Sequence, residues 1–234
     1  MHHVTLDTWS RLPSPIHRLD PRAKIAATLA VLVSLALTRD PGGLRIGGYF
    51  ALLTLLGAAA RVPLAGVILR AALVLPFAGG VALLNLFGGD PARALGLLAK
   101  SFLSAYMVLL MLSTTPLHAL LRGLESFGAP RFLLMVMQFL YRYLFVLSEQ
   151  AQHMMRARDC RGGRRSFAAA RGAVAVLFAR SYARAERIHH AMLARGFRGH
   201  FQLLDPPALR GADLLYLLFI AASLTALHVS LWNH

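Results

Sequence analysis

The sequence predicts an all-α membrane protein with about five transmembrane helices and two or three amphipathic helices inserted before the last span. Apolar residues make up 57% of the 234 residues and charged residues only 15%, against about 45–50% and about 25% in soluble domains. The formal net charge is nevertheless +15. A chain that is both apolar and basic is typical of a membrane protein with a basic face.

Five apolar runs predict the spans. Asp20 suits an N-cap and Pro21 the first turn of a helix, so the first run extends from Pro21 and reaches roughly the 17 residues that a span needs at minimum. Pro76 interrupts the third run, and we expect a kink there. The runs are Ile25–Leu37, Leu44–Ala60, Val67–Phe87, a run within Leu97–Thr115 that starts near Lys100, and Leu214–Trp232.

The distribution of basic residues predicts the topology. The basic residues Arg11, Arg18 and Arg22, with Lys24 just beyond, lead us to expect segment 1–22 in the cytoplasm. The segment lacks an apolar signal-peptide region, so we expect insertion to depend on the spans themselves. Spans 1–4 occupy 23–116 and return the chain to the cytoplasm. Segment 117–211 holds 15 arginines and five acidic residues, a net charge of +10, which independently assigns it to the cytoplasm. The last span occupies 212–234.

The basic segment contains amphipathic helical patterns. In Arg131–Arg158 and in Ala173–Arg195, polar residues recur at helical spacing opposite apolar ones, and Leu117–Phe127 is a shorter third candidate. Part of the first pattern, Phe132–Leu147, is apolar enough to contact lipid. Its polar residues favour the membrane interface or burial against protein instead, and the sequence leaves open whether this stretch lies in the membrane.

One six-residue pattern occurs twice, 37 residues apart. Ala157-Arg158-Asp159-Cys160-Arg161-Gly162 is followed by Ala194-Arg195-Gly196-Phe197-Arg198-Gly199. A single copy is explained by an ordinary helix C-terminus, where arginine offsets the dipole and glycine takes the left-handed position. Two copies favour a docking pair, because guanidinium groups bind carboxylates bidentately. The predicted docking residues are Ala157, Arg158, Asp159, Arg161, Gly162, Ala194, Arg195, Gly196 and Arg198.

At these residues the chain resembles the transmembrane T component of energy-coupling factor (ECF) transporters, the CbiQ/EcfT family. Ala194-Arg195-Gly196 matches the family's Ala-Arg-Gly motif in full, whereas Asp159 replaces the glycine of the first motif. The opening Ser14–Lys24, with Arg18-Leu19-Asp20-Pro21-Arg22, is similar to the CbiQ type, as are residues 1–7. Thr114-Thr115-Pro116 and Tyr141-Arg142-Tyr143 resemble the middle region of the family.

The resemblance implies a non-catalytic subunit of an ABC-type importer in the bacterial inner membrane. Two cytoplasmic coupling helices would dock through the motifs into two ATP-binding cassette ATPase subunits of the CbiO type. The expected membrane partners are a substrate-binding subunit of the CbiM type, a small CbiN-like subunit and the lipid bilayer. The CbiQ-like opening indicates cobalt first and nickel second, with no cofactor, no metal site and no nucleic-acid partner in this chain.

Signals for chemistry are absent from the sequence. Neither lysine, Lys24 or Lys100, follows a Gly-x-x-x-x-Gly pattern, so the chain has no P-loop. The adjacent His189 and His190 diverge by about 100° on a helix and are poorly arranged to share a metal ion. Cys160 is more simply explained as a small residue at a helix end than as a nucleophile.

A second function class stays open. A membrane-anchored surface with a net charge of +10 also suits anionic lipid or nucleic acid. The sequence weakens the nucleic-acid version, because the arginines are spread along helices without a flexible basic run.

Overall fold

The computed structural model describes residues 14, 16–38, 43–162, 167–199 and 210–229. The predicted all-α class is confirmed: these residues form nine helices and no strand. The chain divides into two compact units, residues 1–126 with 207–234 (unit 1) and residues 127–206 (unit 2). Residues 1–13 and Trp232 lie outside the described residues.

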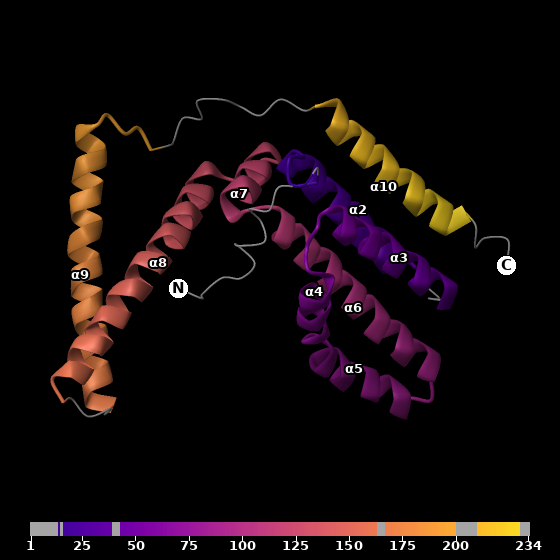
Figure 1. Cartoon of the computed structure of the whole chain (residues 1–234), viewed down its shortest axis with the longest axis horizontal. Helices are drawn as coiled ribbons and strands as arrows, with labels where there is room; N and C mark the ends of the chain where they lie inside the picture. The colour runs from indigo at the N-terminus through magenta and orange to yellow at the C-terminus, as the bar shows by residue number, and fades with distance from the viewer. Residues whose placement is uncertain (1–13, 15, 39–42, 163–166, 200–209, 230–234) are drawn as a thin grey trace. The chain divides into compact units, whose positions relative to one another are not determined.

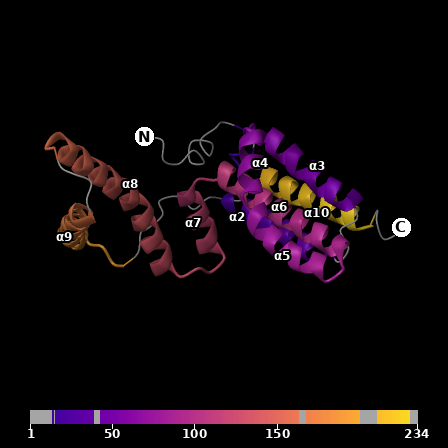
Figure 2. The same ribbon diagram turned by 90° about the horizontal axis from the view of Figure 1, so that it is seen from below.

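Unit 1 contains seven of the described helices (Figure 1). They are α2 (Pro21–Leu37), α3 (Gly43–Ala59), α4 (Leu64–Ala72), α5 (Leu75–Phe87), α6 (Pro91–Thr114), α7 (Leu117–Ser126) and α10 (Gly211–Val229). Helix α6 is the central element and contacts α2, α3, α4 and α5, while α10 lies against α2 and α3. Figure 2 shows the same group of helices from below.

The local sequence explains where the spans begin and bend. The Asp20 carboxylate accepts the backbone N–H of Arg22 at 2.8 Å and Pro21 is the first residue of α2, so the predicted cap is confirmed. The predicted kink is also present: α4 and α5 meet at a bend of 46° beside Pro76. Helix α6 begins at Pro91, about two and a half turns before the expected start near Lys100, because Asp90 and Pro91 provide another helix start.

The core of unit 1 is built from aromatic and aliphatic side chains around α6. Tyr106 is fully buried, and its ring lies 6.1 Å from those of Phe50 and Phe102. Glycines let neighbouring helices approach closely: a Cβ at Gly57 would lie 2.5 Å from Leu64, and one at Gly48 would lie 2.4 Å from Leu227. Small residues at helix contacts are typical of membrane bundles, where close van der Waals packing replaces the hydrophobic effect.

The number of candidate spans differs from the expected five. By length and composition three described helices could cross a membrane, Pro91–Thr114, Arg131–Cys160 and Gly211–His228, or four if bent α4 and α5 form one span. Helices α2 and α3 have 17 residues each, about 25 Å, which is at the lower limit for a span. Conversely, Arg131–Cys160 is long and apolar enough to cross a membrane, because its first half is strongly apolar. The sequence places this helix in the cytoplasmic segment and leaves open whether Phe132–Leu147 lies in the membrane.

The boundary between the two compact units lies between residues 126 and 127. Helix α7 belongs to unit 1, where it packs against α2. A Cβ at Gly123 of α7 would lie 2.7 Å from Ile25 and 3.2 Å from the Pro21 side chain. The glycine therefore allows α7 to lie directly on the first turn of α2, a tertiary contact that the helical pattern of α7 alone does not reveal.

Candidate docking site on the two-helix unit

Unit 2 consists mainly of two long helices, α8 (Arg131–Cys160) and α9 (Phe167–Ala194). Their 30 and 28 residues correspond to about 45 and 42 Å. The predicted patterns Arg131–Arg158 and Ala173–Arg195 are thus present as helices, and the second starts earlier than expected. Figure 2 shows α8 lengthwise and α9 nearly end-on, so the two helices cross rather than run parallel.

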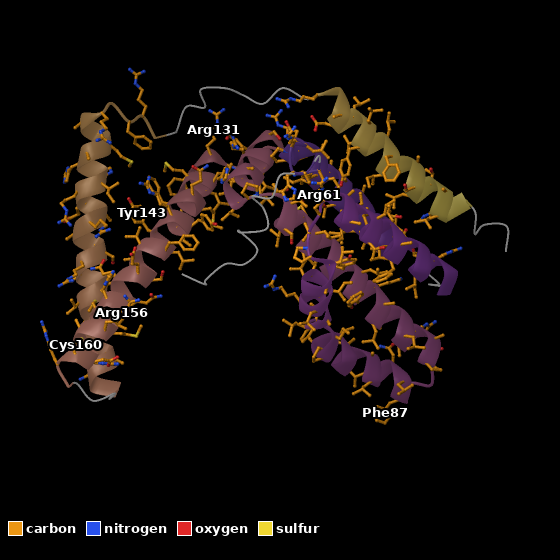
Figure 3. All side chains as sticks on the ribbon, in the orientation of Figure 1. Arg61, Phe87, Arg131, Tyr143, Arg156 and Cys160 are labelled. Carbon is orange, nitrogen blue, oxygen red and sulfur yellow. The ribbon has the colours of Figure 1, made fainter. Side chains whose placement is uncertain are left out.

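The described part of unit 2 has almost no core of its own. Leu134 is its only buried residue, whereas Phe132, Phe178 and Tyr182 have 61–71% of their surface exposed. Large exposed apolar surfaces mark contacts with protein partners or lipid. The side chains along both helices are drawn in Figure 3, where Arg131, Tyr143, Arg156 and Cys160 label α8. The described part of unit 2 therefore leaves large apolar surfaces on both helices that are not covered within the unit.

An apolar groove lies within unit 2 between the first half of α8 and the second half of α9. It has a volume of about 540 Å³, and Arg184 and His189 bring polar groups to it. The sequence predicts an apolar face on each helix, but it does not predict that the two faces form one groove. The lining residues are Val136, Phe139, Leu140, Tyr143, Leu147, Phe178, Ser181, Tyr182, Arg184, Ala185, Ile188, His189 and Met192.

The end of α9 is a complete Schellman motif. The Phe197 N–H donates to the Met192 carbonyl at 3.1 Å and the Gly196 N–H donates to the Leu193 carbonyl at 3.0 Å. Gly196 has φ +77°, a left-handed conformation that strongly favours glycine at this position. Arg195 is therefore the last residue before the cap glycine, and its exposed side chain follows the helix end directly.

The end of α8 shares the left-handed glycine and two of the backbone hydrogen bonds of the α9 end, at different residues of the repeat. Gly162 has φ +67°, its N–H donates to the Asp159 carbonyl at 3.1 Å, and the Arg161 N–H donates to the Arg158 carbonyl. The glycine of this cap is Gly162, while Asp159 is helical, so no glycine is needed where the first motif has aspartate. Arg161 corresponds structurally to Arg195, and Arg158 lies one turn earlier. The helix ends repeat at 34 residues rather than at the 37 of the sequence pattern.

Arg158 and Asp159 form an ion pair at the end of α8. The Asp159 Oδ1 accepts hydrogen bonds from Arg158 Nη2 at 2.7 Å and from Nε at 3.1 Å. The Arg158 side chain is 28% exposed and that of Asp159 is 53% exposed. The pair reduces the net positive charge around Arg158, whereas Arg161, Arg195 and Arg198 are exposed. The remaining predicted docking residues, Ala157 and Ala194, are exposed on the last turns of the two helices.

Metal-binding geometry is not found in the part of the chain that the structure describes, which has no group of three His, Cys, Asp or Glu side chains suited to an ion. The rings of His189 and His190 lie 6.0 Å apart at 54°. Cys160 is exposed beside the cap of α8. The helix ends present the exposed guanidinium groups of Arg161, Arg195 and Arg198.

Comparison with known proteins identifies relatives along most of the chain. The family described as "Cobalt transport protein" (CbiQ) matches residues 13–203. The cobalt transport protein CbiQ of Rhodobacter capsulatus is 31% identical over 206 residues, which cover 82% of this chain and 84% of the relative. The energy-coupling factor transporter transmembrane protein EcfT of Acidaminococcus fermentans is 30% identical, with 84% of each chain covered. EcfT of Bacillus selenitireducens is 29% identical, with 89% of this chain and 91% of the relative covered.

Proposed function

This chain belongs to the CbiQ family of cobalt transport proteins, and on that premise we propose that it couples ATP hydrolysis by partner subunits to metal-ion import. It is a membrane energy-coupling component of an ECF-type transporter. The proposed cargo is cobalt, with nickel as the next candidate, because the matched family and the R. capsulatus relative are both described as cobalt transport proteins. The chain itself would be non-catalytic, since it has no P-loop.

One observation carries the coupling mechanism: α8 and α9 end in the same glycine-capped turn with an exposed arginine directly before the glycine. Two copies of one docking feature suit two copies of one partner. We assign these ends to a pair of ATP-binding cassette ATPase subunits, whose docking surfaces would carry carboxylates for Arg161 and Arg195. Arginine suits this contact because its planar fork binds a carboxylate through two hydrogen bonds.

The two helices are suited to transmit movement. Each is an unbroken helix of about 42–45 Å, so displacement of its capped end moves the apolar half of the helix as well. The groove of about 540 Å³ lies in those apolar halves. We propose that a substrate-binding membrane subunit contacts this apolar surface, so that ATP-driven movement at the capped ends reorients the cargo-binding partner.

The excess of basic residues in unit 2 supports the proposed location. Unit 1 would span the bacterial inner membrane as a multi-pass bundle, with unit 2 at the cytoplasmic side. The described residues of unit 2 contain 11 arginines and three acidic residues, and basic residues are retained on the cytoplasmic side. The small CbiN-like subunit belongs to the same proposal and would associate with the membrane-embedded part.

Co-purification with the ATPase subunits tests the docking proposal. Two double variants distinguish the sequence repeat from the structural one: Arg158→Glu with Arg195→Glu, and Arg161→Glu with Arg195→Glu. We expect the second pair to abolish assembly and ATP-driven cobalt uptake, and the first to weaken both less. Arg171→Glu, an exposed substitution near the other end of α9, is the matched control and should leave assembly intact. Normal assembly of both double variants would contradict the docking proposal.

A second candidate function rests on the excess of arginine in unit 2. A basic helix pair with exposed apolar residues also suits the surface of an anionic membrane. Vesicles with and without phosphatidylglycerol distinguish the two functions. Binding that depends on this lipid, falls steeply with salt and occurs without any ATPase partner would favour the membrane-binding function over coupling.

A further inference from the structure

Three charged side chains are almost fully buried together at one end of unit 1. Asp20 is 7% exposed, Lys24 is 4% exposed and Asp213 is 2% exposed. Charged groups inside a membrane bundle are costly unless they are paired and hydrogen-bonded, and they mark functional positions more often than packing positions. The docking residues of unit 2 do not account for this group, which we call the polar clamp.

Asp213 joins the starts of two helices that are far apart in sequence. Its Oδ1 accepts the backbone N–H of Asp20 at 2.7 Å, and its Oδ2 accepts the backbone N–H of Arg210 at 2.8 Å. Asp20 is the N-cap of α2, and Arg210 directly precedes α10. The carboxylate thus satisfies one unpaired N–H at each helix start, and it lies where both helix dipoles are positive.

Lys24 adds the end of a third helix to the clamp. Its Nζ donates to the Thr114 carbonyl at 2.9 Å and approaches the His17 carbonyl at 3.5 Å. Thr114 is the last residue of α6, so the ammonium group binds one of the carbonyls that a helix C-terminus leaves unpaired. The positive charge also lies at the negative end of the α6 dipole. The clamp therefore connects α2, α6 and α10.

The clamp lies near both connections between unit 1 and unit 2, through α7 on one side and through Arg210 on the other. After Thr114 the chain enters α7, which lies on the first turn of α2 through Gly123, and unit 2 begins at residue 127. The chain returns to unit 1 at residue 207, three residues before Arg210. Any force transmitted along either connection reaches clamp residues before it reaches the middle of a span.

We propose that the polar clamp passes movement of unit 2 to α2, α6 and α10 as one body, which makes Lys24 and Asp213 positioning residues for energy coupling. This inference rests on the proposed function, because it assumes that unit 2 is moved by ATPase partners. Removing one charged residue from a buried group of charges leaves the others uncompensated. The ends of α2, α6 and α10 would then respond separately to movement of unit 2.

The test is the ratio of cobalt taken up to ATP hydrolysed, measured on the reconstituted complex with its ATPase and substrate-binding subunits. Lys24→Met and Asp213→Asn remove one charge each. We expect both variants to assemble with the ATPases and hydrolyse ATP while the ratio falls at least fivefold. Lys24→Arg keeps a charged donor and should restore most of the ratio.

Lys100→Met is the matched control. Lys100 also donates from within a helix of unit 1 to a helix-terminal carbonyl, that of Thr38 at the end of α2. That contact is remote in sequence from both connections to unit 2, so its loss should leave the ratio unchanged. If the single variants fail to fold, Asp20→Asn combined with Lys24→Met, which removes one charge of each sign, takes their place with the same expected fall.

The outcomes separate this inference from the proposed function. Wild-type complex that lacks ATP-driven uptake or does not bind the ATPases contradicts the proposed function. A normal wild-type ratio together with normal ratios in Lys24→Met and Asp213→Asn overturns the clamp alone. A parallel loss of assembly, hydrolysis and uptake in the clamp variants and in Lys100→Met also overturns it, since the clamp would then be merely structural.

Discussion

The Asp213 side chain accepts the backbone N–H of Asp20 at 2.7 Å across 193 residues of sequence. This bond joins the N-cap of α2, the first described helix, to the first turn of α10, the last described helix. Both residues are buried, so neither group has water as an alternative partner.

Asp213→Ala should lower the free energy of unfolding of unit 1 by about 3 kcal/mol. The change leaves the buried N–H of Asp20 and the N–H of Arg210 without their acceptor, and hydrogen bonds to a charged group contribute roughly 1.5–3 kcal/mol each. Denaturant unfolding in detergent measures the difference. Asp213→Asn keeps one strong acceptor and should lose about half as much. Equal stability of Asp213→Ala and wild type would contradict the structural role of this bond.

Gly162→Ala and Gly196→Ala should each destabilise one helix end by roughly 1 kcal/mol, because an L side chain is strained at positive φ. No atom lies within 4 Å of either added Cβ, so the effect is conformational rather than steric. We expect faster amide exchange in the last turn and weaker binding to the ATPase subunits, with the rest of the chain unchanged. Gly172→Ala, inside α9 and equally uncrowded, should instead stabilise its helix by about 0.5–1 kcal/mol.

Gly123→Ala should destabilise the packing of α7 on α2 by about 1–3 kcal/mol, the usual cost of overpacking. The added Cβ would lie 3.4 Å from the Pro21 backbone carbon and 2.7 Å from Ile25 Cδ1, and the backbone can relax less easily than the side chain. Thermal unfolding in detergent measures the loss. Gly79→Ala has nothing within 4 Å and should be neutral or slightly stabilising. A loss of the same size in both variants would argue against the close approach of α7.

Asp159→Asn should strengthen association with the ATPase subunits by a factor of up to about 5, the range of one exposed ion pair. The change removes the partner of Arg158 and one negative charge from the docking end, while the helical backbone at this position needs no glycine. Titration of the purified ATPase at two salt concentrations measures the effect, which should shrink at high salt. Weaker association would mean that Asp159 itself contacts the partner.

Local signals in the sequence predict several helix starts and one bend. Asp20 with Pro21 predicts the start of α2, and Pro76 predicts the bend between α4 and α5, because caps and prolines act through the nearest turn of backbone. The repeated Ala-Arg pattern marks the ends of α8 and α9, where docking is proposed. The repeat in the sequence aligns Arg158 with Arg195, whereas the helix ends align Gly162 with Gly196. This alignment depends on where each helix stops, which the pattern of residues does not fix.

The sequence by itself determined the all-α membrane class, the basic two-helix segment and the residues at its ends. These properties follow from composition, helical period and capping, which act over a few residues. Only the tertiary structure decided that Asp213 meets Asp20, that Lys24 binds the end of α6, and that the faces of α8 and α9 form one groove. Those contacts depend on how separate helices pack, and neither the burial of a charge nor its partner is encoded in the spacing of neighbouring residues.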